Sequence, residues 1–149
     1  MTVALDGSEH ARGALAWLTA LPLTAGTRLQ LVGVAEAAHY PSSAPGAVRG
    51  TLRSAVAALE AERRALVETE CAAAAETVRG RPLRVETNVP VGRPGDVIVR
   101  ETHEYGSDLV VVGARGLGAL ERLMLGSVSE FVLRHARCPV LIVRPRVTA

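Results

Sequence analysis

The segment VVVGARGLGALERLMLGSVSE, residues 110–130, joins a run of valines to a glycine-rich stretch and a helix start. The valines predict a buried strand, and three glycines follow it, Gly113, Gly116 and Gly118. A helix is expected to open at Ser127. Glycine lets backbone amides approach a ligand, and a helix N-terminus offers unpaired N–H groups and a positive dipole end. The segment therefore predicts an anion-binding cradle between a strand and a helix.

Strand and helix signals alternate along the whole chain. Apolar runs predict strands at 2–5, 29–34, 83–89, 109–112 and 139–143. Helical spacing predicts helices after Ser8, over 52–78, over 94–105 and from Ser127. Pro, Ser and Gly predict one long loop over 37–50. Because continuously apolar strands that alternate with helices require a parallel sheet with helices on both faces, we predict a single α/β domain over residues 1–149.

Two helices carry more detailed expectations. In the 52–78 helix, one apolar stripe is expected to face the sheet: Leu52, Val56, Leu59, Leu66, Val67, Ala74 and Val78. Cys71 lies on the same face and, like Cys138 before the last strand, is expected to be a small packing residue. In the 94–105 helix, Val97, Ile98 and Tyr105 are expected to point inward.

The alternation alone leaves the strand order open. In the order 3-2-1-4-5, the chain reverses direction between the first and fourth strands, and a ligand-binding crevice opens at their carboxyl ends. The residues that leave these two strands are Asp6-Gly7-Ser8 and 113–116. This order would bring the two segments together in a candidate site.

Composition excludes several kinds of function. The chain has 149 residues and all 17 basic ones are arginine, which excludes a Walker-type lysine and a Schiff-base lysine. A net charge of +2 and 3% aromatic residues argue against nucleic-acid binding. No apolar stretch is long enough for a membrane span, and the first ten residues show no positive or long apolar region, so we expect an untargeted protein. With two cysteines and four histidines that show no metal-ligand spacing, we expect a cytoplasmic protein without a protein-held metal.

These motifs together carry a family resemblance. The pattern G-x2-G-x9-G-S is met by Gly113, Gly116, Gly126 and Ser127, and it accompanies VALDGSE at 3–9, PVGRPGDVIV at 90–99 and CPVLIV at 138–143. The chain thereby resembles the universal stress protein family over nearly its whole length. The resemblance implies a Rossmann-like, adenine nucleotide α-hydrolase-like fold, with an open five-stranded parallel sheet in the order 3-2-1-4-5. The complete glycine motif implies the branch that binds ATP, with Mg²⁺ as an option.

The resemblance also implies a set of site residues. Gly113, Arg115 and Gly116 would line the phosphates and ribose with their backbones, and Gly126, Ser127, Val128 and Ser129 would hold the phosphates through amides and hydroxyls. Ala4, Leu5 and Asp6 would border the nucleoside, while Val34 and Val112 would pack on the adenine. Since relatives usually carry more residues before this aspartate, we expect either a short first strand or a start codon upstream.

Structural roles for the same residues remain open. Ser127 with Glu130 also fits a capping box, Asp6 with Ser8 also fits a helix cap, and Arg115 and Arg122 also fit solvated loop charges. The glycines could mark a loop without a ligand.

Function and assembly likewise leave alternatives. The leading interpretation is an ATP-binding regulatory module, a homodimer through strand 139–143 as the resemblance implies, that presents a nucleotide-dependent surface to an unidentified protein partner. A slow ATPase, a protein that phosphorylates itself on Ser127 or Ser129, and a nucleotide-independent interaction protein are the alternatives. AMP, ADP or a cyclic nucleotide could fit the same slot.

Overall fold

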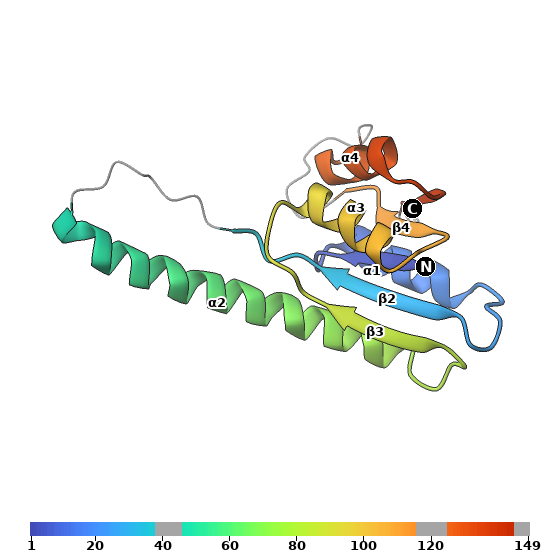
Figure 1. Ribbon diagram of the computed structural model, residues 1–149. Helices are drawn as coiled ribbons and strands as arrows, with labels where there is room; N and C mark the ends of the chain where they lie inside the picture. The colour runs from blue at the N-terminus through green and yellow to red at the C-terminus, as the bar shows by residue number, and fades with distance from the viewer. Residues whose placement is uncertain (38–45, 116–124, 145–149) are drawn as a thin grey trace, which may run out of the picture.

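The computed structural model describes residues 1–37, 46–115 and 125–144, with the backbone alone at 46–49 and 51. Strands and helices alternate along these residues: β1 (Thr2–Leu5), α1 (Glu9–Thr19), β2 (Arg28–Gly33), α2 (Gly46–Thr77), β3 (Arg84–Asn88), α3 (Pro94–Glu104), β4 (Val110–Gly113), α4 (Ser127–His135) and β5 (Val140–Val143). The strands form one parallel sheet in the order β3-β2-β1-β4-β5 (Figure 1). The predicted fold class is confirmed, and the predicted strand ends fall within one residue of those observed.

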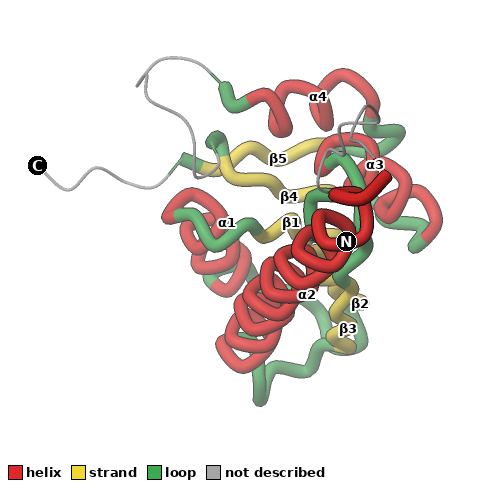
Figure 2. The backbone as a smooth tube through the Cα atoms, turned by 90° about the vertical axis from the view of Figure 1, so that its left-hand side faces the viewer, coloured by secondary structure: helices red, strands yellow, loops and turns green. Residues whose placement is uncertain are grey.

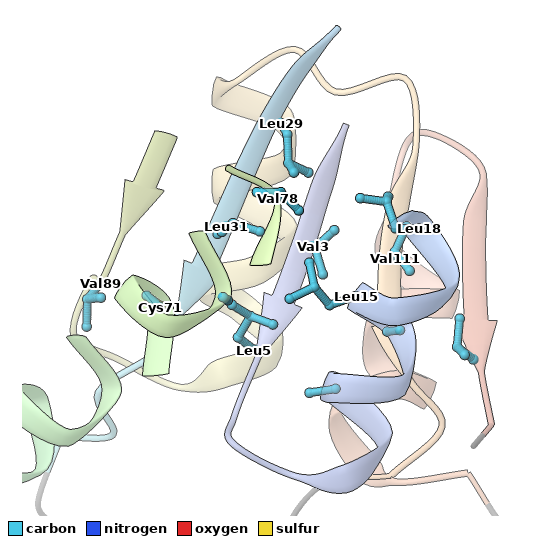
Figure 3. Packing of buried hydrophobic residues seen from close by; sticks show 14 of the residues in the cluster. Val3, Leu5, Leu15, Leu18, Leu29, Leu31, Cys71, Val78, Val89 and Val111 are labelled. Carbon is cyan, nitrogen blue, oxygen red and sulfur yellow. The ribbon is translucent and has the colours of Figure 1, made fainter. Parts of the chain in front are cut away.

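The sheet is covered on both faces. Helices α1 and α2 lie on one face, and α3 and α4 lie on the other (Figure 2). The larger core cluster fills the first face, where Val3, Leu29 and Leu31 are fully buried (Figure 3). Val32 and Val132 are fully buried in the cluster on the second face. Each such side chain stabilises the fold by about 1.5–3 kcal/mol relative to an exposed one, so the two clusters hold the helices on the sheet.

Local sequence explains the start of the first and third helices. The chain turns at Gly7, and the Ser8 hydroxyl then accepts a hydrogen bond from the Ala11 amide and caps α1. Pro94 opens α3, where its missing N–H is no loss. Tyr105 does not point inward as predicted. Tyr105 is the C-cap residue of α3, and the guanidinium carbon of Arg28 lies 5.0 Å from the centroid of the Tyr105 ring.

Helix α2 begins earlier than the sequence predicted. The predicted loop over 37–50 is too long, because residues from Gly46 onward are helical. The run of proline and serine ends at Pro45, and residues that tolerate a helix follow it. Residues 38–45 of the predicted loop lie outside the described part of the chain.

The predicted apolar stripe of α2 is buried only in its C-terminal half. Cys71, Ala74 and Val78 pack against the sheet, whereas Leu59 and Leu66 are 43% and 63% exposed. The helix has 32 residues and spans about 48 Å, while the six residues of β2 span about 20 Å. Its N-terminal half therefore projects past the carboxyl end of the sheet (Figure 1). Within the described ranges, no helix has the length and hydropathy needed to cross a bilayer.

Candidate functional site

A cleft of about 1140 Å³ opens at the carboxyl end of the sheet. The ends of β1, β2 and β4, the start of α4 and the middle of α2 form its walls. It is lined by every predicted site residue that the structure describes: Ala4, Leu5, Asp6, Val34, Val112, Gly113, Arg115, Gly126, Ser127, Val128 and Ser129. Gly116, the remaining predicted residue, lies outside the described residues. These distant segments meet because the strand order places β1 beside β4.

One part of the cleft is an aliphatic slot. Val112 is buried to 2% exposure and Ile98 to 4%, and Ala4 and Val34 pack against the same cluster. All of them also line the cleft. Aliphatic side chains suit the flat face of an aromatic ring system, so this part of the cleft can hold a purine.

The start of α4 lines the cleft with backbone amides that have no partner among the described residues. Gly126 is the N-cap residue, no side chain caps the helix, and the first intrahelical bond runs from the Glu130 amide to the Gly126 carbonyl. The amides of Ser127, Val128 and Ser129 therefore have no partner within the helix. The predicted capping box is wrong, because Ser127 is the first helical residue instead of the cap. Free amides at the positive end of a helix dipole form an anion site.

The Ser129 hydroxyl is already engaged within the protein. It donates a 2.6 Å hydrogen bond to the Gly113 carbonyl, and Ser129 is 4% exposed. This bond joins the start of α4 to the end of β4. The Ser129 hydroxyl thus has a structural role here, its predicted contact with a phosphate stays a prediction, and the Ser129 amide has no partner within the helix. Ser127, by contrast, is exposed at the mouth of the cleft.

Arg115 brings a buried donor that lacks an acceptor. Its Nε atom is inaccessible to solvent and has no hydrogen-bond partner among the described residues. Its carbonyl oxygen accepts a 3.3 Å hydrogen bond from the Ser8 hydroxyl, which ties the β1–α1 turn to the segment after β4. A buried donor without an acceptor costs about 1–3 kcal/mol, and other atoms of Arg115 line the cleft.

Asp6 has a structural role in the β1–α1 turn. Its Oδ1 accepts a 3.0 Å hydrogen bond from the Ser8 amide. This is the local turn that an Asp-Gly-Ser sequence favours. The carboxylate is nevertheless exposed in the wall of the cleft, so its second oxygen is available to a ligand.

Gly113 is required by helix packing as well as by the cleft. A Cβ at this position would lie 2.8 Å from the backbone carbonyl carbon of His10 and 2.9 Å from the Ala11 amide nitrogen. Helix α1 therefore rests directly on the end of β4. The sequence motif gave this glycine only a ligand-binding role, because no local pattern reveals contact with a helix a hundred residues earlier.

Sequence reasoning missed one wall of the cleft. Helix α2 contributes a strip of residues at helical spacing: Arg63, Leu66, Val67, Thr69 and Glu70. The sequence pattern placed the apolar members of this strip on the sheet. The remaining unpredicted lining residues come from several elements: Gly7, Ala11, Ala35, Glu36, Pro94, Ile98 and Leu125.

The described residues offer no metal site and no reactive thiol. No group of three or more histidine, cysteine or carboxylate side chains among them could hold a metal ion. Burial raises the pKa of the Cys71 and Cys138 thiols, so both are weaker nucleophiles than an exposed cysteine. Both pack against the core clusters.

Comparison with known proteins gives a consistent set of relatives. The model of the Universal stress protein family matches residues 1–144. A segment of 61 residues is 48% identical to a universal stress protein of Staphylococcus aureus strain USA300, and it spans 40% of this chain and 37% of that relative. The chain therefore matches well under half the length of that curated relative.

Solved structures share the fold at low sequence identity. The protein MJ0577 is similar over 99% of this chain and 96% of its own, with a TM-score of 0.83 and 21% identity. A family member from Arabidopsis thaliana, solved with AMP bound, matches 98% of this chain and 91% of its own at a TM-score of 0.66 and 22% identity. Another, solved in complex with cAMP, matches 96% and 94% at a TM-score of 0.50 and 24% identity.

Proposed function

The chain belongs to the universal stress protein family, and on that premise we propose that its cleft binds an adenine nucleotide, with ATP as the ligand, and that the chain acts as a stress-response regulatory module. One observation carries the proposal. Amides at the start of α4 that have no partner among the described residues, and the Arg115 side chain, line the same cleft as an aliphatic surface. Hydrogen-bond donors that suit a phosphate lie beside an apolar surface that suits a purine, and a nucleotide contains both groups.

In this arrangement each part of the nucleotide has its own set of contacts. The adenine lies between Val34 and Val112, and the ribose crosses the end of β1 near Asp6. The phosphates accept hydrogen bonds from the amides at 127–129 and from Arg115. Since the chain contains no lysine, phosphate binding falls to backbone amides, serine hydroxyls and arginine. Mg²⁺ would be held mainly by phosphate oxygens, because the described residues supply no cluster of ligands for it.

The relatives support an adenine nucleotide as the class of ligand. One structural neighbour is solved with AMP and another with cAMP. We propose regulation as the role of the bound nucleotide. The Ser129 hydroxyl is buried and engaged with Gly113, so Ser127 is the better placed of the two serines to accept a phosphoryl group in the self-phosphorylation alternative. The regulatory unit we propose is a homodimer that pairs through β5 and presents a nucleotide-dependent surface to a protein partner.

The N-cap of α4 gives the sharpest test of the proposal. Gly126 has a φ of −67° and a ψ of 151°, which an aspartate at an N-cap readily adopts. In Gly126→Asp, the new carboxylate would bind the free amides and repel phosphate, while the helix stays capped. We expect isothermal titration with ATP and Mg²⁺ to show an affinity at least about tenfold lower than that of Gly126→Asn, whose side chain has the same shape without the charge.

Two outcomes would contradict the proposal. If Gly126→Asp and Gly126→Asn bind ATP with equal affinity, the phosphates do not bind at the start of α4. Failure of the parent chain to bind ATP, AMP or cAMP would leave the nucleotide-independent interaction protein as the better reading.

A further inference from the structure

Helix α2 forms the cleft wall that faces the end of β1, and Gly33 sets how this helix is turned. A Cβ at Gly33 would collide with the Val67 side chain and would come within 2.8 Å of the Cys71 sulfur, so these two side chains rest directly on β2. Glu70 lies between them in sequence and lines the cleft together with Val67. The packing on Gly33 therefore holds residue 70 at the edge of the cleft, where it also borders a smaller pocket beside α1.

The Glu70 carboxyl group lies over the turn between β1 and α1. Its carboxyl carbon is 3.4 Å from the position that a Cβ would take at Gly7. No hydrogen bond or ion pair joins Glu70 to another described residue, so both of its oxygens are free to accept. Asp6, the neighbour of Gly7, already uses one oxygen to accept the Ser8 amide. Glu70 is thus the carboxylate at this turn with its full hydrogen-bonding capacity unused by the described residues.

The polar groups of the cleft call for a ligand with both acceptors and donors. The start of α4 and Arg115 supply donors, whereas Asp6, Glu36 and Glu70 supply acceptors. In a ribonucleotide, the phosphates are the acceptors. The vicinal 2′ and 3′ hydroxyls are a pair of donors, and their spacing suits the two oxygens of a single carboxylate.

We propose that Glu70 accepts hydrogen bonds from the 2′ and 3′ hydroxyls of the bound ribose and is thereby a specificity-determining residue. This inference rests on the proposed nucleotide site. It defines the ligand class as ribonucleotides with both hydroxyls free, such as AMP, ADP and ATP. Nucleotides that lack one of the two donors, such as 3′,5′-cyclic AMP or 2′-deoxy-AMP, bind more weakly. In their complexes, one carboxylate oxygen gives up its hydrogen bond to water and gains none from the ligand.

The test compares ligands within each variant. Affinities for AMP, 3′,5′-cyclic AMP, 2′-deoxy-AMP and 3′-deoxy-AMP are measured by isothermal titration on the parent chain, Glu70→Gln, Glu70→Ala and Glu68→Gln. Glu68 is the matched control, since it pairs with Arg64 outside the cleft. We expect the parent and the control to prefer AMP by about tenfold or more over each deoxy analogue. In Glu70→Ala this preference should fall about tenfold, with Glu70→Gln in between because its amide keeps one acceptor.

The ratio of affinities separates recognition of the ribose from a space-filling role. If Glu70 only fills the wall, its replacement weakens all four ligands equally and leaves the ratio unchanged, which would overturn the inference while nucleotide binding stands. If none of the four ligands binds the parent chain, the proposed function itself fails and the inference fails with it. Unchanged thermal unfolding of the Glu70 variants would confirm that the comparison is made on folded protein.

Discussion

Gly113 shows how one residue can satisfy two constraints at once. Its neighbours line the cleft, and its missing side chain lets α1 rest on β4. We expect Gly113→Ala to lower the free energy of unfolding by about 1–3 kcal/mol, because the new methyl group would overlap backbone atoms of α1 that cannot move aside. Urea denaturation followed by circular dichroism would measure the loss.

The matched control for Gly113 is a glycine with free space around it. Gly50 lies in α2, and a Cβ there would meet no atom within 4 Å. Gly50→Ala should therefore raise the free energy of unfolding by about 0.5–1 kcal/mol, since alanine restricts the unfolded chain and favours helix. Similar effects of the two substitutions would contradict the packing role of Gly113. Because Gly113 also packs against α1, a Gly113 variant could lose nucleotide binding through a change in the fold, without any lost contact to the ligand.

At the scale of elements, α2 divides into two halves with different energetic roles. Val78, the residue directly after α2, is 1% exposed against the sheet, whereas Leu66 is 63% exposed on the wall of the cleft. We expect Val78→Ala to lower the free energy of unfolding by about 2 kcal/mol, through lost burial and the cavity that remains. Leu66→Ala should change it by less than about 0.5 kcal/mol. Equal costs in urea denaturation would restore the single buried stripe that the sequence predicted.

Helix α2 also shows which features could be predicted from the sequence and which could not. Strands such as β2 and the start of α4 follow from local patterns of apolar residues, glycine and serine, which is why the fold agrees with the structure and most of the predicted site residues line the cleft. The role of α2 as a cleft wall depends on how far the helix extends beyond the carboxyl end of the sheet and on its close packing against Gly33. Both are tertiary facts, so the sequence pattern did not single out Arg63 or Glu70 as site residues.

For the whole molecule, the site is a product of topology. The turn after β1, the segment after β4 and the middle of α2 come from distant parts of the chain, and they meet because the order β3-β2-β1-β4-β5 puts the change of direction between β1 and β4. The hydrogen bond from Ser8 to Arg115 joins the first two of these segments directly. A ligand that binds in the cleft is therefore expected to stabilise β1 with its neighbours β2 and β3, and β4 with its neighbour β5, at the same time.

The same topology leaves β5 at an edge, which leads to a prediction about assembly. Among the described residues, β5 pairs with β4 alone, and Val140, Leu141 and Ile142 remain partly exposed. An apolar edge strand with unpaired backbone groups is prone to pair with another copy, and we propose that two chains pair through it. Light scattering at micromolar concentration should then give about twice the 15.6 kDa mass of one chain. Leu141→Asp should give a monomer, because it places a charge in the paired edge, whereas Leu133→Asp, at an exposed position on α4, should stay a dimer. A parent chain that scatters as a monomer, or equal dissociation of the two variants, would contradict pairing through β5.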